Sequence, residues 1–481
     1  MAMSRVSEGG RTMAEVPLMR TTVSWTRRRV AGAMASLATT VLAACRAQAP
    51  AAPSGDAGSV QPVKAPSTNT AVVMWHPWDQ HRKAIVDEIV ERFQKQYPTI
   101  QIQQELVLLW QREAVDKLVA AFAGGLGPDV TMLYADYLPF FAENETLSPL
   151  DTYLRRDRVS RDTWYQADID GCTLDGKTWL LPHVLPNMPW IIYTDKSHLE
   201  TVGLDFDKEP PATWADFEEA ARKLLVVEAG KLVRMGFFMA INSAPVFETW
   251  LGTRKLAAFS PDARKATFGD SGAVETLQWM VDFRNRVNGG KAIQDQMGSI
   301  ARFPSPGQAQ TNPSGNEAMI QGTIQYAELW VRLPEFRMGM FGVMPPVKGA
   351  EMALPHRQAW GVGMSNQSKV KDAAWLVVKK FTAEEDGGGY LQLRQNRLSP
   401  IRKMNEHPDY RKNNPYLDRF IKVLEARWTR PAAYVPDEVM RIYTNALNEV
   451  HNEQKNARQA LTEAAAQAQA VLDQYWAARR R

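Results

Sequence analysis

Two carboxylates occupy positions from which they could take part in chemistry. Asp79 and Asp136 each follow a short apolar run, at residues 72–75 and 130–133, of the kind that forms a buried strand. One acid and one base about 5–9.5 Å apart can hydrolyse a glycosidic bond. Since the sequence does not state the distance between the two carboxylates, a secreted glycosidase or lyase that uses them stays open as one interpretation.

No other catalytic or metal-binding signature occurs in the sequence. The seven histidines are scattered without a His-Glu-x-x-His motif, and the two cysteines form no Cys-x-x-Cys pair. The glycine run 387–389 follows three acidic residues, which is unsuited to phosphate, and no P-loop or dinucleotide motif is present. Cys172 is expected to be a small buried hydrophobic residue. Apart from the open interpretation of the two carboxylates, the sequence therefore predicts no catalytic residue, no metal site and no cofactor.

The other cysteine, Cys45, ends a run that is typical of an export signal. Three arginines at residues 27–29 precede an apolar stretch, 31–41, that is too short to span a bilayer stably. The ending Leu42-Ala43-Ala44-Cys45 resembles the bacterial lipobox. It predicts that residues 1–45 are a signal peptide and that Cys45 is lipidated; an ordinary cleaved signal with an incidental cysteine is the alternative. The paired arginines leave export by the twin-arginine route or the general route open.

Composition limits the partners of the mature chain. The 481 residues are enough for two lobes or domains, and the formal net charge is +4. Residues 1–45 contain six arginines and two glutamates, so they account for all of this charge. A neutral remainder gives no electrostatic case for nucleic acid or an anionic lipid surface. The 15 tryptophans and 13 tyrosines suit a packed core or a flat, hydroxyl-rich ligand.

A linker and an alternating set of elements follow. Residues 46–70 are rich in Ala, Pro, Ser and Gly, which predicts a flexible linker. After it, strands are expected at 72–75, 100–106 and 130–133, with helices at 84–97 and 113–123. This alternation predicts a parallel sheet with helices on its faces. Ligands of such sheets bind beyond the carboxyl ends of the strands, which here are residues 75–79 and 134–137.

The later elements follow a proline-rich stretch. Pro182, Pro186 and Pro189 lie between apolar strands at 180–182 and 191–193, which predicts a crossover between lobes. The remaining predicted elements are a helix capped by Thr213 that runs to Leu225, strands at 343–346 and 360–364, and helices at 371–381 and 448–476. The last helix is expected to dock on its own domain, with a coiled-coil partner as the alternative.

The order of these motifs resembles one family, the bacterial extracellular solute-binding proteins of family 1, the maltose-binding type. The matching stretches lie at 73–98, 118–130, 147–151, 177–182, 193–195, 211–217, 317–322, 360–365, 373–381 and 400–401, among them Pro128-Asp129-Val130 and Thr213-Trp214. The resemblance implies the α/β fold of the type II periplasmic binding proteins, in which two hinged lobes close on a ligand in the cleft. It also implies that the chain is not an enzyme.

The resemblance further implies an organisation and a role. It places residues 71–184 and 345–383 in a first lobe, and residues 185–344 and 384–481 in a second. Family members deliver sugars, mainly oligosaccharides, to an ABC permease. The chain is thus expected to be an exported monomer, lipid-anchored to the outer face of the cell membrane or periplasmic, that carries a sugar to the permease. A receptor for glycerol phosphate or a peptide stays open, and no nucleic-acid partner is expected.

Eight positions match ligand-contacting positions of the family or are candidates beside them. They are Trp75, Trp78, Asp79, Asp136, Asn187, Trp250, Trp330 and Trp360. Indole rings would pack on the C–H faces of a sugar, and carboxylate and amide groups would bind its hydroxyls; a group left unpaired costs about 1–3 kcal/mol. Trp78 is expected to face the cleft. The structural alternatives are the core for Trp75, Trp250 and Trp360, a cap or turn for the two aspartates, and a local backbone bond for Asn187.

One departure from the family pattern concerns the segment after Gly322. Relatives often carry an aromatic residue shortly after this glycine, whereas Thr323 and Ile324 follow it here. Either Trp330 replaces that aromatic platform or the site lacks it. The identity of the sugar therefore stays open.

Overall fold

The computed structural model describes residues 61–108, 112–186, 188–306, 315–355, 359–428 and 435–479. The chain divides into two units, Met1–Gly58 and Ser59–Arg481, and all described residues belong to the second. The predicted signal peptide with Cys45, most of the predicted linker, and Asn187 lie outside the described residues. No helix in the described part is both long and apolar enough to cross a membrane.

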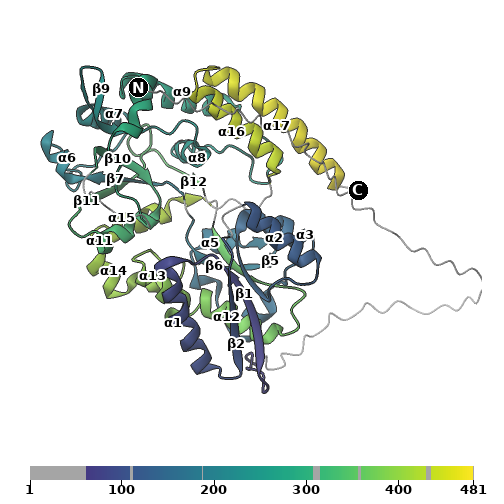
Figure 1. The fold of residues 1–481 in the computed structure, drawn as a ribbon. Helices are drawn as coiled ribbons and strands as arrows, with labels where there is room; N and C mark the ends of the chain where they lie inside the picture. The colour runs from purple at the N-terminus through teal and green to yellow at the C-terminus, as the bar shows by residue number, and fades with distance from the viewer. Residues whose placement is uncertain are drawn as a thin grey trace, which may run out of the picture. The chain divides into compact units, whose positions relative to one another are not determined.

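Five strands form the first sheet, in the order β2-β1-β3-β13-β6 (Figure 1). They are β1 (Thr70–His76), β2 (Ile100–Leu106), β3 (Val130–Tyr134), β6 (Leu180–Val184) and β13 (Trp360–Met364). β1 is parallel to β2 and β3, as predicted, whereas β13 runs antiparallel to β3 and β6. The first residue of β13 therefore pairs with the last residues of β3 and β6. The ends of β1, β3 and β6 and the start of β13 thus lie at one edge of the sheet.

Five other strands form the second sheet, in the order β11-β7-β10-β9-β8. They are β7 (Ile191–Asp195), β8 (Val226–Glu228), β9 (Lys231–Phe237), β10 (Glu317–Gly322) and β11 (Met338–Gly342). Two-stranded ladders join β4 (Thr173–Leu174) to β5 (Lys177–Thr178), and β12 (Leu354–Pro355) to β14 (Arg427–Trp428). The parts of the molecule built around the first and second five-stranded sheets are called the first and second lobes below.

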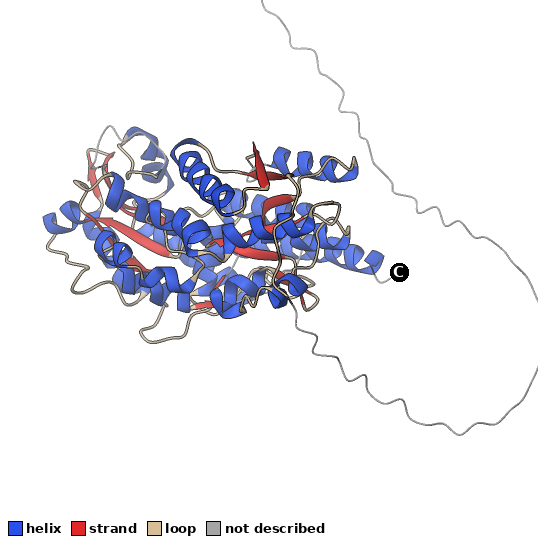
Figure 2. Ribbon diagram, turned by 90° about the horizontal axis from the view of Figure 1, so that it is seen from below, coloured by secondary structure: helices blue, strands red, loops and turns tan. Residues whose placement is uncertain are grey.

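Helices cover both sheets, and Figure 2 shows the red strands enclosed between blue helices. In the first half of the chain they are α1 (Gln80–Gln96), α2 (Arg112–Ala123), α3 (Leu138–Glu143), α4 (Asp151–Arg156), α5 (Gln166–Gly171), α6 (Lys196–Thr201) and α7 (Trp214–Leu224). Then follow α8 (Ala244–Gly252), α9 (Ser271–Arg286), α10 (Lys291–Gln294), α11 (Leu329–Arg332), α12 (Lys371–Thr382), α13 (Tyr390–Arg394), α14 (Pro408–Asn413), α15 (Leu417–Glu425), α16 (Asp437–His451) and α17 (Ala457–Arg479). Short 3-10 turns extend β3 and β10, namely η1 (Ala135–Tyr137) and η4 (Ile324–Glu328).

Local sequence accounts for the helices that matter most here. In α1, Ile89 and Phe93 are fully buried and lie on one face, as the apolar spacing predicts. The cap of α7 is also confirmed: Asp216 N donates to Thr213 Oγ1 at 3.2 Å, and Thr213 N donates to the Asp216 carboxylate at 2.9 Å. This reciprocal pair satisfies two backbone donors that the first turn would otherwise leave free.

Two predicted elements are placed wrongly. The strand expected at 343–346 lies earlier, in β11, because Pro345 and Pro346 have no N–H with which to join a ladder. The single helix expected at 448–476 is two helices, α16 and α17, separated by a turn in which Glu453 has φ 60°. Asn456 starts the second helix because its Oδ1 accepts a hydrogen bond from Gln459 N at 2.9 Å. As predicted, α17 docks on its own chain, against α16 and α9.

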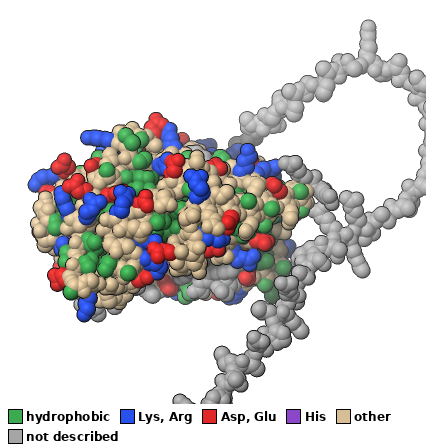
Figure 3. All heavy atoms as spheres, turned by 90° about the horizontal axis from the view of Figure 1, so that it is seen from above, with side chains coloured by type: hydrophobic (Ala, Val, Ile, Leu, Met, Phe, Trp, Pro, Cys, Tyr) green, Lys and Arg blue, Asp and Glu red, His purple; other side chains and the backbone are tan. Residues whose placement is uncertain are grey.

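The C-terminal part of the chain contacts both lobes. Tyr390 in α13 donates to Glu88 Oε2 in α1 at 2.7 Å. In contrast, α16 packs against α8 and α17 against α9, two helices that follow strand β9 of the second sheet. At the far end of α17, Arg479 Nη2 lies 2.6 Å from Glu143 Oε2 in α3 of the first lobe. The lobe boundaries proposed from sequence stay a prediction. Figure 3 shows acidic and basic side chains interspersed over one face of the molecule.

Candidate ligand-binding cavity

A cavity of about 350 Å³ opens at the edge of the first sheet where the four strand ends meet. Residues of both lobes line it: Pro77, Trp78, Arg82, Tyr134, Val184, Leu185, Ile324, Gln325, Trp360 and Arg397. The first-lobe residues come from the loop after β1, the first turn of α1, the ends of β3 and β6, and the start of β13. The second lobe contributes the η4 turn after β10. This is the edge at which the strand order predicts a ligand.

Trp78 is held in the cavity wall by two buried histidines. Its indole Nε1–H donates to His183 Nε2 at 3.1 Å, and its backbone N–H donates to His76 Nδ1 at 3.2 Å. Each histidine therefore carries its proton on the other nitrogen, which donates to Phe381 O at 2.6 Å from His183 and to Gln104 Oε1 at 3.1 Å from His76. Burial lowers the pKa of both histidines to about 4, so both are neutral at neutral pH.

Two further aromatic rings form the neighbouring wall. Tyr134 and Trp360 are paired across β3 and β13, and their ring centroids lie 3.8 Å apart at an interplanar angle of 44°. Trp360 is buried to all but 8 % of its surface, yet it borders the cavity. Burial raises the pKa of Tyr134 to about 12, so its hydroxyl stays protonated and can donate a hydrogen bond. The wall thus combines flat apolar faces with polar edges.

A second cavity, of about 310 Å³, lies beside β10 in the second lobe. Phe238, Ala240, Val246, Arg302, Phe303, Ser305, Glu317, Ile320, Gln321 and Tyr326 line it. The Tyr326 ring stacks on Tyr193, with centroids 5.0 Å apart and planes at 27°. Arg302 makes two hydrogen bonds to the buried Glu317 carboxylate, from Nε at 2.8 Å and Nη2 at 3.2 Å. The two cavities border the same segment, residues 320–326.

Buried charges from both lobes meet at the wall of the first cavity. Glu328, in η4, is 1 % exposed, and its Oε1 accepts hydrogen bonds from Arg397 Nε at 2.5 Å and from Arg82 Nη2 at 3.3 Å. Arg332 Nη1 and His81 Nε2 each lie 3.7 Å from Glu328 Oε2. Since Arg82 belongs to α1 and Glu328 to η4, this pair connects the first lobe to the second.

The sequence-predicted site residues divide into three groups. Trp78 and Trp360 line the first cavity. Asp79 and Asp136 stand half-buried beside lining residues, in the turns after β1 and β3. Asp79 is the N-cap residue of α1, but its side chain makes no capping hydrogen bond.

Three predicted tryptophans pack in the core instead of lining either cavity. Trp75 is 5 % exposed, in β1, with Lys117 Nζ 4.8 Å from its ring centre. Trp330 stacks on Tyr416, with ring centroids 5.4 Å apart, and donates to Met338 O at 3.1 Å. Trp250 is fully buried, and its Nε1–H donates to Gln321 Oε1 at 3.0 Å, so it orients a side chain that lines the second cavity.

Sequence reasoning missed several residues that line the cavities. Tyr326 is the aromatic residue nearest to Gly322 on its C-terminal side, and searching only the two positions after the glycine, or only for tryptophan, overlooked it. Tyr134 is the last residue of β3 and lies at the predicted ligand-binding edge, residues 134–137, but it is not among the eight predicted contacts. Arg82 and Arg397 gave no signal, because a single arginine on a helix or in a loop is indistinguishable from a solvated one.

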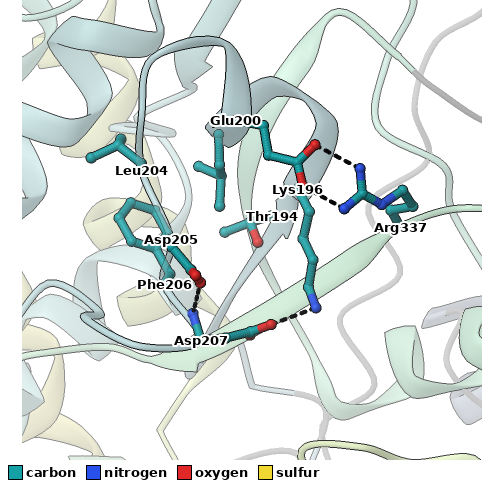
Figure 4. A pocket seen from close by; sticks show the side chains of 9 residues that line it. Thr194, Lys196, Glu200, Leu204, Asp205, Phe206, Asp207 and Arg337 are labelled. Atoms are coloured by element: carbon teal, nitrogen blue, oxygen red, sulfur yellow. Dashed lines mark hydrogen bonds and ion pairs between the residues drawn. The ribbon is translucent and has the colours of Figure 1, made fainter.

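Another cavity, of about 250 Å³, lies at the outer edge of the second sheet (Figure 4). Its charged groups already have partners: Lys196 Nζ lies 2.6 Å from Asp207 Oδ2, Arg337 pairs with Glu200, and Lys208 pairs with Asp205. Because these side chains neutralise one another, this cavity has fewer charged groups available to bind a solute than the first cavity has. The first cavity is therefore the candidate site.

Comparison with known proteins agrees with this geometry. Residues 78–387 match the family described as bacterial extracellular solute-binding protein. The chain belongs to this family. A substrate-binding protein of Listeria monocytogenes, solved with cycloalternan, aligns with this solute-binding protein at a TM-score of 0.68 and 19 % identity, covering 84 % of this chain and 99 % of that one. The sugar-binding protein MalE of Xanthomonas citri aligns at a TM-score of 0.67 and 20 % identity, covering 86 % of this chain and 100 % of that one.

Two curated relatives differ in how much of the chain they match. A binding protein of Brucella abortus is 24 % identical over 395 residues, which are 80 % of this chain and 89 % of that protein. The sn-glycerol-3-phosphate-binding periplasmic protein of Escherichia coli is 24 % identical over 157 residues, 32 % of this chain and 35 % of that one. The family resemblance and the two-lobed type II fold are thus confirmed. The chain is a binding protein and not an enzyme, so the two-carboxylate hydrolase is excluded.

Proposed function

We propose that this solute-binding protein captures a carbohydrate in the first cavity and delivers it to the transmembrane subunits of an ABC importer. The observation that carries the proposal is the cavity wall, in which Trp78, Tyr134 and Trp360 present aromatic faces beside polar groups of both lobes. Aromatic faces pack on the C–H surfaces of sugar rings, while the polar groups select the hydroxyl pattern. The structures solved for similar proteins, with cycloalternan and with mannotriose, support a saccharide ligand.

Delivery requires that the solute favour a closed arrangement of the lobes. A ligand shifts a two-state equilibrium only through contacts that differ between the states. A solute in this cavity would contact Trp360 of the first lobe and Gln325 of the second at once. Such contacts are lost when the lobes separate, so binding would stabilise closure. We further propose that lipid on Cys45 keeps the protein near the permease, with residues 46–70 as the tether.

Binding without turnover tests the proposal. Purified protein is incubated with a panel of mono- and oligosaccharides, the heat of binding is measured, and the recovered sugar is analysed by chromatography. We expect one class of sugar to bind at one per chain and to be recovered unchanged. At a concentration one hundred times Kd, it should stabilise the fold by about 2.7 kcal/mol in thermal unfolding. Accumulation of a cleaved product, or binding that Trp360→Ala leaves unchanged, would contradict the proposal.

A further inference from the structure

The first cavity carries an excess of positive charge in its wall. Among the described residues that line it are two arginines, Arg82 and Arg397, and no carboxylate. Both arginines donate to the same oxygen of Glu328, which is buried behind them. A third guanidinium, that of Arg332, approaches the other oxygen of this carboxylate at 3.7 Å. One negative charge is therefore shared among three positive ones.

The excess is not removed by loss of a proton. Burial lowers the pKa of Arg397 to about 10, which still leaves the guanidinium charged at neutral pH. The neighbouring His81 does not add to the charge, because burial and then Arg82 lower its pKa. The two guanidiniums in the cavity wall share one carboxylate with that of Arg332, so positive charge remains at this part of the wall and favours a negatively charged occupant.

The remaining donors of both arginines suit a planar or tetrahedral anion. Arg82 uses Nε toward Gln395 Oε1 and Nη2 toward Glu328, and Arg397 uses Nε toward Glu328 and Nη2 toward Gln325 Oε1. Within the described part of the chain, the Nη1 group of each arginine donates no hydrogen bond. A guanidinium binds carboxylate and phosphate oxygens with strong, charge-assisted hydrogen bonds.

We propose that the solute is an anionic saccharide, one that carries a carboxylate or a phosphate. Its anionic group binds Arg82 and Arg397, and its sugar ring packs against the aromatic wall at Trp360. This inference rests on the proposed function and narrows its substrate class. Because Arg82 belongs to the first lobe and Arg397 contacts η4 of the second, the anion also adds a charged link across the cleft.

Isothermal titration of the whole mature protein against matched probes tests the inference. The neutral probes are glucose, maltose, cellobiose and mannobiose. The carboxylate probes are glucuronate and cellobiouronic acid, the phosphate probes are glucose 1-phosphate and sn-glycerol 3-phosphate, and inorganic phosphate is the sugar-free anion. The variants are Arg82→Gln and Arg397→Gln. Arg332→Gln is the matched control, because Arg332 also contacts Glu328 but does not line the cavity.

We expect an anionic saccharide to bind at least tenfold more tightly than its neutral counterpart. Its affinity should fall as NaCl rises from 20 to 300 mM, since salt screens the attraction, and this readout needs no variant. Arg82→Gln and Arg397→Gln should each remove most of the preference for the anion, while Arg332→Gln keeps it. The carboxylate and phosphate probes then identify which anion the site takes.

Other results would overturn the inference in distinguishable ways. If neutral sugars bind as tightly as anionic ones and salt has no effect, the anion preference is wrong and the proposed carbohydrate function stands. If inorganic phosphate or glycerol 3-phosphate binds as tightly as glucose 1-phosphate, the ligand is an anion but not a saccharide. If no probe binds to a protein that circular dichroism shows to be folded, the proposed function fails as well.

Discussion

Replacing Glu328 with glutamine should be among the most destabilising single changes in the second lobe. The Glu328 and Arg397 side chains are 1 % and 7 % exposed, and Nε lies 2.5 Å from Oε1. Removal of one partner from a buried ion pair costs about 3–5 kcal/mol, because the other charge stays buried without compensation. Glutamine keeps one acceptor for Arg397 but places its NH₂ group, itself a donor, toward the Arg332 guanidinium. We therefore expect Glu328→Gln to lower the free energy of unfolding by about 3 kcal/mol.

Urea unfolding at pH 7, followed by tryptophan fluorescence, measures this loss. The double variant Glu328→Gln/Arg397→Gln removes both charges, so it should cost less than the sum of the single changes by about 1–3 kcal/mol. Glu91→Gln is the control, because Glu91 and Lys95 form an exposed pair whose loss should leave the urea midpoint unchanged. A loss below about 1 kcal/mol for Glu328→Gln, or strict additivity in the double variant, would refute the reasoning.

Three further predictions test the cavity wall, its histidines and the anchor. Trp360→Ala should weaken sugar binding at least thirtyfold, a loss of about 2 kcal/mol, whereas Trp330→Phe, which alters a ring packed on Tyr416 outside the cavity, should leave calorimetric affinity within twofold. In the unfolded chain His76 and His183 bind protons below about pH 6.5, whereas in the folded protein they stay neutral until about pH 4. The free energy of unfolding should therefore fall between pH 6.5 and pH 4, by up to about 3 kcal/mol for each histidine. His183→Gln should make the urea midpoint less dependent on pH, and an unchanged pH profile would count against the assignment. Cys45→Ala should abolish incorporation of labelled palmitate and release the protein from membranes in fractionation, and a mutant that stays lipidated would show that another residue is the anchor.

Much of the fold could be predicted because short stretches of the sequence specify its helices and strands. The apolar spacing that ends in Phe93 indicates α1, the Thr213 capping box starts α7, and short apolar runs mark β1 and β3. The errors arose where local pattern did not decide the structure. Apolar and alanine-rich spacing continues across the turn at Glu453, and only the capping of a new helix by Asn456 shows that the chain breaks there.

The sequence alone was enough to predict the family, the order of the elements and the edge of the sheet at which we propose that a ligand binds. It did not determine which aromatic side chains reach that edge. Trp360 lines the cavity because β13 runs antiparallel to β3, which places its first residue beside Tyr134; Trp250, a residue of the same type, is buried by its helix and orients Gln321 instead. Strand direction and register are properties of the folded sheet.

The charge of the first cavity's wall could not be predicted from the sequence, because it depends on the tertiary structure. Arg82, Glu328 and Arg397 lie in three segments far apart in the sequence, and none of them belongs to a local pattern. Folding brings these three side chains next to one another and leaves little of each exposed. Water then screens their charges less, so an imbalance of charge interacts more strongly with a bound solute. Local periodicity reports which face of an element is buried, but the meeting of charges from two lobes depends on the packing of the whole chain.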